Sequence, residues 1–158
     1  MTFIEDDGGR QAAGYRGYAG DCVVRAICIA TGLPYQQVYD DINQLAKRER
    51  IGKRKRKISS ARTGVFKQTT KRYLTSLGWK WTPTMKIGSG CTVHLHDGEL
   101  PMGRLIVRVS KHVTAVIDGV IHDTHDPQRA TLWYEAGAPK PVRITRRCVY
   151  GYFSKEQS

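Results

Sequence analysis

Residues 112–124, HVTAVIDGVIHDT, predict two short strands joined by a tight turn. β-Branched residues stand on both sides of Asp118-Gly119, a dipeptide that favours the two-residue turn of an antiparallel hairpin. In that register Ile117 faces Val120 across the turn. This hairpin is the clearest structural signal in the chain, and the rest of the fold is predicted outward from it.

The same register places two titratable side chains on one face of the hairpin. His112 faces His125, and Asp123 faces Thr114. His112 and Asp123 are then diagonal neighbours, with about 7 to 8 Å between their backbones, a gap that an imidazole and a carboxylate bridge. A histidine at the start of a strand, oriented by a carboxylate on the next strand, is the base half of a nucleophilic site.

Further alternating segments, divided by Gly, Pro and Asp, extend the hairpin into a sheet. They are residues 79–84, 91–96, 103–110 and 146–153. Helical spacing of apolar residues precedes them, at 22–31, 34–50 and 65–77. Helices first and strands second predict an α+β fold, with N-terminal helices packed on a C-terminal antiparallel sheet.

Length and composition indicate a single folded domain. The chain has 158 residues, of which 40% are hydrophobic and 25% charged, values typical of globular proteins. Five glycines and three acidic residues among residues 1–20 predict a flexible, irregular arm. We expect the domain at 21–153 and a short tail at 154–158. No apolar run approaches the roughly 20 residues of a membrane helix.

The stretch GDCVVRAICIATG, residues 20–32, begins the first helix with a cysteine. Asp21 is a favourable N-cap, and Gly32 stands where helices commonly end. A thiolate at Cys22 gains from the helix dipole and the free amides, and a nearby imidazolium lowers its pKa further. Asp21 opposes the thiolate unless its carboxylate caps the helix. The alternative role for Cys22 is core packing, because cysteine is among the most buried residue types.

The four cysteines form no CxxC pair and no zinc-finger spacing, and the N-terminus lacks the layout of a signal peptide. We therefore expect free thiols in a reducing cytoplasm, with Cys28, Cys91 and Cys148 as packing residues. A metal site built from Cys91, His94 and His96 is the alternative, but structural zinc usually draws on two close ligand pairs. We expect no metal and no cofactor.

The chain is strongly basic, with 26 Lys and Arg against 14 Asp and Glu and a net charge of +12. Residues 47–57 contain eight Lys or Arg, whose mutual repulsion predicts a mobile basic loop at 47–62. With the basic residues at 62, 67, 71 and 72, the region 47–72 is a candidate surface for nucleic acid or another anionic partner. Its candidate contacts are Lys53, Arg54, Lys55, Arg56 and Lys57. The alternative is a solvated loop, since no aromatic residues are interleaved.

Asp21-Cys22 opening an apolar helix, the following TGLPYQQVYDDI, His112 opening a strand and Asp123 closing the hairpin together resemble the papain-like cysteine peptidase superfamily. The resemblance covers about residues 20–153. It is closest to the compact bacterial branch that includes the leader-processing peptidase domains of bacteriocin exporters. It extends to small phage and plasmid proteins with HxxAVIDGVIHDT and RCVYGYF.

This resemblance implies a papain-like fold and a thiol hydrolase with a Cys-His-Asp triad. By position, Cys22 matches the nucleophile, His112 the general base and Asp123 the orienting residue. Papain-like enzymes have a Gln about six residues before the cysteine as an oxyanion donor, and this chain has Arg16 there, with Gln11 further upstream.

The resemblance also implies a cytoplasmic protein of phage or mobile-element origin that cleaves an amide or isopeptide bond in a protein or peptide. The alternative is a non-enzymatic basic adaptor on the same fold. Such an adaptor would bind nucleic acid or a large ribonucleoprotein or virion assembly through its basic region, and it would need neither the thiol nor the imidazole.

Overall fold

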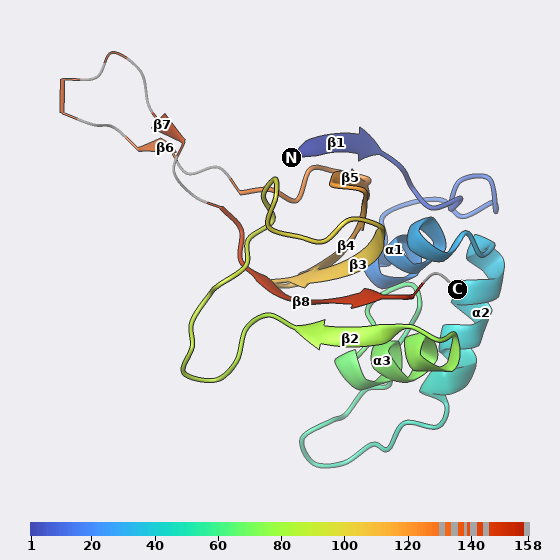
Figure 1. Ribbon diagram of the computed structural model, residues 1–158. Coiled ribbons are helices and arrows are strands. Elements are labelled where there is room, and N and C mark those ends of the chain that lie inside the picture. Colours follow the sequence, from blue (N-terminus) through green and yellow to red (C-terminus); the bar gives the residue numbers. More distant parts are fainter. Residues whose placement is uncertain (130–131, 134–135, 138, 140–141, 144–145, 157–158) are drawn as a thin grey trace.

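In the part of the chain that the structure describes, three helices pack on a six-stranded mixed sheet (Figure 1). The computed structural model describes residues 1–129, 132–133, 136–137, 139, 142–143 and 146–156. The helices are α1 (Cys22–Thr31), α2 (Tyr35–Ala46) and α3 (Lys67–Ser76). The strands are β1 (Thr2–Glu5), β2 (Lys80–Pro83), β3 (Arg104–Val109), β4 (His112–Ile117), β5 (Val120–Asp123), β6 (Leu132–Trp133), β7 (Val142–Arg143) and β8 (Val149–Ser154). The predicted α+β class is confirmed.

The helices follow the apolar patterns of the sequence. Helix α1 is apolar nearly all round and is buried along its length, and it ends at Gly32 in the left-handed conformation, with a φ of 76°. Helix α2 buries one stripe that includes Val38 and Ile42. It ends at Ala46, before the expected residue 50, because the like charges that follow oppose its continuation. None of the described helices has the length and hydropathy of a membrane span.

The six-stranded sheet has the order β1-β5-β4-β3-β8-β2, and β6 with β7 forms a separate ribbon. Its pairs are antiparallel except that β1 runs parallel to β5, with Glu5 opposite Asp123. Two expectations are corrected here: the sheet is mixed, and the first 20 residues are not irregular throughout. The arm was predicted from the glycines at positions 8 to 20, and β1 precedes all of them.

The hairpin around Asp118-Gly119 has the predicted register. Ile117 pairs with Val120, and the two turn residues have φ values of 48° and 79°, as a type I′ turn requires. The Asp118 carboxylate also accepts a 2.8 Å hydrogen bond from the amide of Gly103. The turn therefore holds the chain that enters β3.

Two apolar layers cover the two faces of the sheet. On one face, α1 and α3 pack on the sheet, whose side chains there include Ile106, Val113 and Phe153, and α2 packs on α1 and α3. On the other face, Leu95 packs against a second cluster from β3, β4, β5 and β8. The segment 91–96, expected as a strand, is irregular apart from one bridge between His94 and Cys148.

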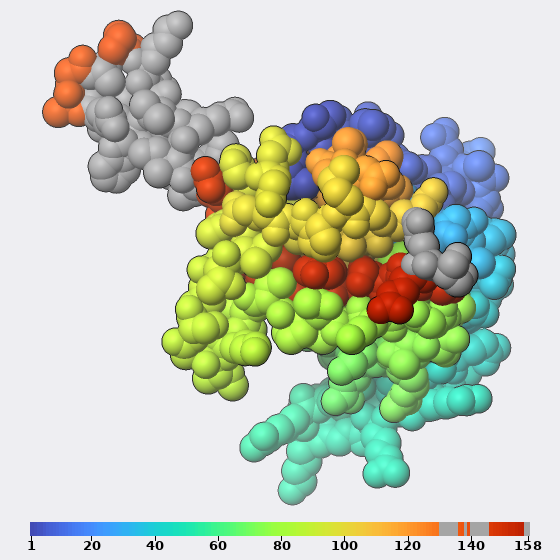
Figure 2. All heavy atoms as spheres, in the orientation of Figure 1, coloured from blue at the N-terminus to red at the C-terminus, as the bar shows by residue number. Residues whose placement is uncertain are grey.

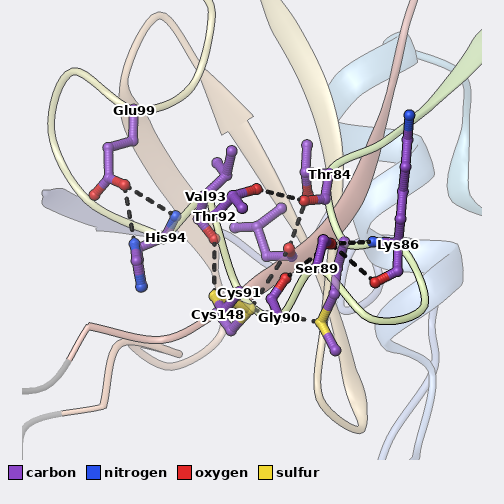
Figure 3. Close-up of a disulfide and its surroundings, with 12 residues drawn as sticks. Thr84, Lys86, Ser89, Gly90, Cys91, Thr92, Val93, His94, Glu99 and Cys148 are labelled. Carbon is purple, nitrogen blue, oxygen red and sulfur yellow. Dashed lines mark hydrogen bonds and ion pairs between the residues drawn. A yellow bond between two sulfur atoms is a disulfide. The ribbon is translucent and has the colours of Figure 1, made fainter.

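Cys91 and Cys148 form a disulfide, with 5.9 Å between their Cα atoms (Figure 3). The expectation of free thiols at these two positions is therefore wrong. The bridge stands where residues 91–96 meet the start of β8, held by 2.8 Å hydrogen bonds from Leu95 N to Arg147 O and from Val149 N to Val93 O. Cysteine spacing does not reveal the pair, because 57 residues separate its members and only the tertiary bridge aligns them.

Candidate active site

Cys22 is the first residue of α1 and lines a cleft of ≈ 630 Å³. The cleft lies between this end of α1 and the start of β4, and its walls include His112, Val113 and Arg108. Cys22 is partly exposed, so its thiol is accessible from the cleft. Among the described residues no side chain caps α1, which leaves the amides of its first turn free as donors beside the thiol.

His112 and Asp123 make the contact that the hairpin register predicts. Nε2 of His112 lies 2.6 Å from Oδ2 of Asp123, and the rings of His112 and His125 are 5.0 Å apart. Asp123 is further held by the amide of Thr124, which donates to Oδ1 at 2.7 Å. Because Nε2 is bound to the carboxylate, Nδ1 is the nitrogen left to serve Cys22.

The pKa values of the Cys22 thiol and the His112 imidazole are shifted in opposite directions. Burial acts to raise the pKa of Cys22, but the hydrogen bond and charge of His112, aided by the Val113 amide and by Arg25, outweigh it and lower that pKa. Burial acts to lower the pKa of His112, but Asp123 and Cys22 raise it to about 9. These shifts favour a thiolate paired with an imidazolium.

Cys28, the other free thiol, contrasts with Cys22. It is buried in the first apolar layer, as expected for a packing residue. Burial, with a contribution from the nearby Asp21 charge, raises its pKa to about 12. The two free cysteines of one helix therefore differ in both access and acidity.

Asp21 does not cap α1, contrary to the prediction. Its carboxylate accepts hydrogen bonds from Nη1 of Arg25 and from the hydroxyl of Tyr35, the latter at 2.6 Å, and Nε of Arg10 lies 3.3 Å away. Asp21 is only 1% exposed, so these partners are what compensates its charge. The carboxylate next to Cys22 is thus paired with two guanidinium groups, which offset its charge.

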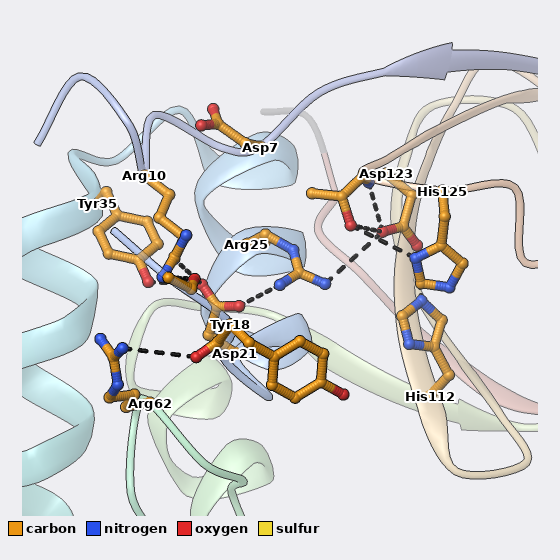
Figure 4. A network of polar contacts seen from close by, with 12 residues as sticks. Asp7, Arg10, Tyr18, Asp21, Arg25, Tyr35, Arg62, His112, Asp123 and His125 are labelled. Carbon is orange, nitrogen blue, oxygen red and sulfur yellow. Dashed lines mark hydrogen bonds and ion pairs between the residues drawn. The ribbon is translucent and has the colours of Figure 1, made fainter. Parts of the chain in front are cut away.

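Arg25 joins the helix to the hairpin and was missed in the sequence. While Nη1 contacts Asp21, Nη2 lies 3.8 Å from Oδ1 of Asp123 (Figure 4). The sequence signal for this role is that Arg25 is the one charged residue within an apolar helix. Charged residues are rarely buried unless they are paired, so such a residue is expected to have an acidic partner.

The structure brings neither predicted oxyanion side chain to Cys22. The Arg16 side chain is exposed, and its carbonyl accepts from Arg10 and from Arg62, at 3.2 Å each. Gln11 borders a different hollow, beside Asp6 and Asp7. Neither residue is among those that line the cleft, and sequence distance from the cysteine does not encode such loop positions. The free amides at the start of α1 are donors beside the thiol.

Arg108 lines the Cys22 cleft and was also missed. Burial lowers the pKa of its guanidinium, and the Cys22 thiolate acts in the opposite direction. No carboxylate in the described part of the chain lies within 4.0 Å of it. The sequence does carry a signal for it. In the apolar strand RLIVRV, Arg108 is a charged residue two positions after Ile106, and it therefore shares the face that the helices cover.

Residues 53–57 of the basic loop are not among those that line the cleft. Lys55 is paired, with Nζ 3.0 Å from Glu49 and 4.3 Å from the centre of the Phe66 ring. The other four candidate contacts are exposed, and within the described residues no carboxylate lies within 4.0 Å of them: Lys53, Arg54, Arg56 and Lys57. In Figure 2 the side chains of this segment (teal, lower edge) stand out from the body of the molecule.

The residues of the alternative metal site have other partners. Cys91 is in the disulfide, and Nδ1 of His94 lies 2.9 Å from Glu99. Over the described ranges, no group of three or more His, Cys, Asp or Glu is arranged to hold a metal ion.

The site thus brings together a free thiol, an imidazole bound to a carboxylate, and free helix amides, groups of the kind that thiol acyl transfer requires. No protein-family model, curated protein or solved structure matches this chain.

Proposed function

We propose that the protein is a papain-like thiol hydrolase, a peptidase or amidase that cleaves an amide or isopeptide bond. The observation that carries the proposal is the 2.6 Å contact between His112 and Asp123 beside the thiol of Cys22. The lowered pKa of Cys22 and the raised pKa of His112 support the assignment, because the thiolate is the nucleophilic form.

In the first half of the reaction, Nδ1 of His112 holds the proton of Cys22 while the thiolate attacks the carbonyl carbon. A carbon–sulfur bond forms, and the amides at the start of α1 stabilise the negative oxygen. The imidazolium then gives its proton to the leaving amine as the carbon–nitrogen bond breaks. Asp123 fixes the tautomer of His112 and stabilises its charge.

In the second half, His112 removes a proton from water, and the resulting hydroxide adds to the thioester carbon. The carbon–sulfur bond breaks, the acyl group leaves as a carboxylic acid, and Cys22 returns to its starting state. The cycle consumes one water for each amide bond and needs no cofactor.

The direct test is the covalent intermediate. The protein is incubated with a peptide library from a digested proteome, quenched in acid and weighed intact, while new peptide termini are counted by mass spectrometry. We expect acyl adducts and cleavage in the wild type, loss of both in Cys22→Ala, and retention in Cys28→Ala. A Cys22→Ala protein that cleaves as well as the wild type would falsify the proposal.

A basic adaptor is the second candidate, favoured by the four exposed cations of residues 53–57 that lack a carboxylate partner in the described part of the chain. Binding of a single-stranded RNA should weaken steeply with salt and fall when these four are changed to Gln. Lys55→Gln is the matched control, because its charge is already paired with Glu49. The adaptor role requires that Cys22→Ala bind unchanged.

A cytoplasmic location and a phage or mobile-element origin belong to the same proposal. The disulfide between Cys91 and Cys148 bears on the location, since such bonds are rare in a reducing cytoplasm and persist in oxidising compartments. Alkylation of intact cells followed by mass spectrometry measures its state. A reduced pair in cells supports the cytoplasm, and a fully oxidised pair argues against it.

A further inference from the structure

A second groove, more apolar than the cleft, lies beside the Cys22 site and shares Arg108 with it. Its volume is ≈ 440 Å³, enough for one large side chain and the adjoining backbone. Its lining includes Trp81, Pro83, Met85, Phe153, Lys67 and Lys71.

Strand register places the groove and the nucleophile in one row across the sheet. Arg108 of β3 pairs with Val113 of β4 on one side and with Gly151 of β8 on the other. Val113 borders Cys22 in the cleft, and Gly151 lies under the ring of Trp81. A chain bound in the cleft therefore reaches the groove by passing over Arg108.

The floor of the groove is a fixed apolar shelf. Trp81 pairs with Phe153 in the register of β2 and β8, and their ring centres are 4.8 Å apart. A Cβ atom on Gly151 would stand 2.3 Å from Cζ2 of Trp81, so the absence of a side chain there lets the indole lie against the strand. The shelf is thus built into the backbone of β8.

The rim of the groove carries three cations. Lys67 and Lys71 lie one turn apart on α3, both exposed, and Arg108 stands between the groove and the cleft. In the described ranges none of the three has a carboxylate within 4.0 Å. An apolar floor under unpaired cations is complementary to an apolar side chain flanked by acidic groups.

We infer that this groove binds an acidic peptide segment of the substrate. Its aromatic or large aliphatic side chain rests on Trp81 and Met85, and neighbouring Asp or Glu carboxylates pair with Arg108, Lys67 and Lys71. The inference rests on the function proposed for Cys22, because the row across the sheet makes the segment part of the chain that is cut.

The lining favours a peptide over single-stranded nucleic acid. Bases stack on aromatic rings whose faces are open in succession along the strand. Here one face of Trp81 covers Gly151, its ring packs on Phe153, and Pro83 and Met85 supply aliphatic walls.

Binding to the Cys22→Ala protein tests the groove without turnover. Fluorescent peptides with the cores Asp-Phe-Glu, Lys-Phe-Lys and Asp-Ala-Glu are compared by anisotropy in low salt. We expect the first to bind about tenfold more tightly than either of the others, since it alone combines the buried side chain with the charge pairs.

Variants of the groove locate the binding. Lys67→Glu with Lys71→Glu should cost the Asp-Phe-Glu peptide about tenfold in affinity and narrow its advantage over Lys-Phe-Lys. Lys80→Glu, also exposed and one residue from Trp81 in β2, should change little. Trp81→Ala should lower the affinity for the two peptides that contain Phe. Met85→Ala, at an exposed wall, gives the same readout if Trp81→Ala does not fold.

Equal binding of the three peptides, or affinities unmoved by the groove variants, overturns the inference. An oligouridylate that binds more tightly than Asp-Phe-Glu and competes with it also overturns it, in favour of nucleic acid. Failure of the proposed function is distinct: the peptides then bind the groove selectively, yet the wild-type protein forms no acyl adduct and cuts none of them.

Discussion

Nη2 of Arg25 lies 3.8 Å from Oδ1 of Asp123, while Nη1 of the same guanidinium donates to Asp21. One buried cation therefore pairs with the carboxylate next to Cys22 and contacts the carboxylate bound to His112. Because Asp21 precedes α1 and Asp123 ends β5, this cation also joins the two elements that build the site. Stability and chemistry depend here on the same contacts.

Arg25→Met should lower the free energy of unfolding by about 3 to 5 kcal/mol, the usual cost of leaving buried carboxylates without their partner. Urea unfolding at pH 7 measures it. Arg104→Met is the matched control: Arg104 reaches the other end of α1 through the carbonyls of Ile29 and Ala30 and should cost about 1 kcal/mol.

Adding Asp21→Asn to Arg25→Met should recover part of the loss, since one stranded charge is then removed. If the double variant instead loses as much free energy of unfolding as the two single variants together, the pairing of Arg25 with Asp21 is not what stabilises the protein.

The alkylation rate of Cys22 should show the coupled titration of the pair. Since the pKa of Cys22 is lowered and that of His112 is raised to about 9, iodoacetamide should label Cys22 below the pH at which an ordinary thiol reacts. A second change in rate should appear near pH 9 as the imidazolium loses its proton. Labelling followed by peptide mass spectrometry reports each site.

His112→Ala should slow Cys22 labelling at pH 7 by about tenfold or more, because burial alone raises the pKa of the thiol. Cys28 is the internal reference, and its pKa of about 12 should keep it unlabelled in folded protein. Equal labelling rates for the two thiols would contradict the site.

Asp123→Asn should bring the pKa of His112 down from about 9, because the Asp123 hydrogen bond is the largest influence that raises it. Because the pKa of His112 is raised in the folded protein, its protonation contributes to the free energy of unfolding. This contribution is complete below the ordinary histidine pKa of 6.5 and is lost as the pH rises through 9. The stability difference between wild type and Asp123→Asn should therefore be larger at pH 6 than at pH 10.

Asp126→Asn provides the charge control, since Asp126 is exposed and its contacts are to Gln128. NMR titration of the His112 ring protons measures the pKa in each variant. A His112 pKa that stays near 9 in Asp123→Asn would show that another group holds the proton.

Loss of the disulfide should destabilise the fold by about 4 kcal/mol, as loop-closure entropy predicts for a bridge between residues 57 apart. Urea unfolding of the wild type with and without reductant measures the change, and Cys91→Ser with Cys148→Ser should match the reduced wild type. Cys22 labelling should be unchanged, because the bridge does not line the cleft. A reductant effect that persists in the double variant would point to another cause.

Glu49→Gln should loosen the start of the basic loop. Although burial acts to raise it, the pKa of Glu49 is lowered to about 2 by hydrogen bonds from Ser59 and Thr69 and by Lys55. The stabilisation is complete above the ordinary value of 4.5 and is lost as the pH falls towards 2. The variant should be less stable than wild type at pH 7 and nearly equal to it at pH 2, by thermal unfolding.

The hairpin shows why part of the site was predictable. Asp118-Gly119 specifies the turn by backbone geometry alone, and the turn specifies the register that brings His112 to Asp123. Helix α1 was equally clear, because its apolar run and Gly32 are local signals. These features need no information from distant residues.

The oxyanion side chains, the role of Asp21 and the disulfide were predicted wrongly or missed for a common reason. Each depends on where a loop or a distant segment lies: Arg16 is exposed and outside the cleft lining, Tyr35 and Arg25 bind the Asp21 carboxylate, and Cys91 meets Cys148 across 57 residues. Local patterns carry no record of such contacts, since they are selected by packing of the whole chain.

By itself the sequence determined the three helices, the central hairpin, and the pairing of His112 with Asp123, because turn chemistry and apolar periodicity act over a few residues. Only the tertiary structure decided the parallel strand β1, the charge balance around Asp21 and the groove beside Arg108. Those features arise where side chains from separate elements meet, and local sequence patterns, which act over a few residues, do not encode such contacts.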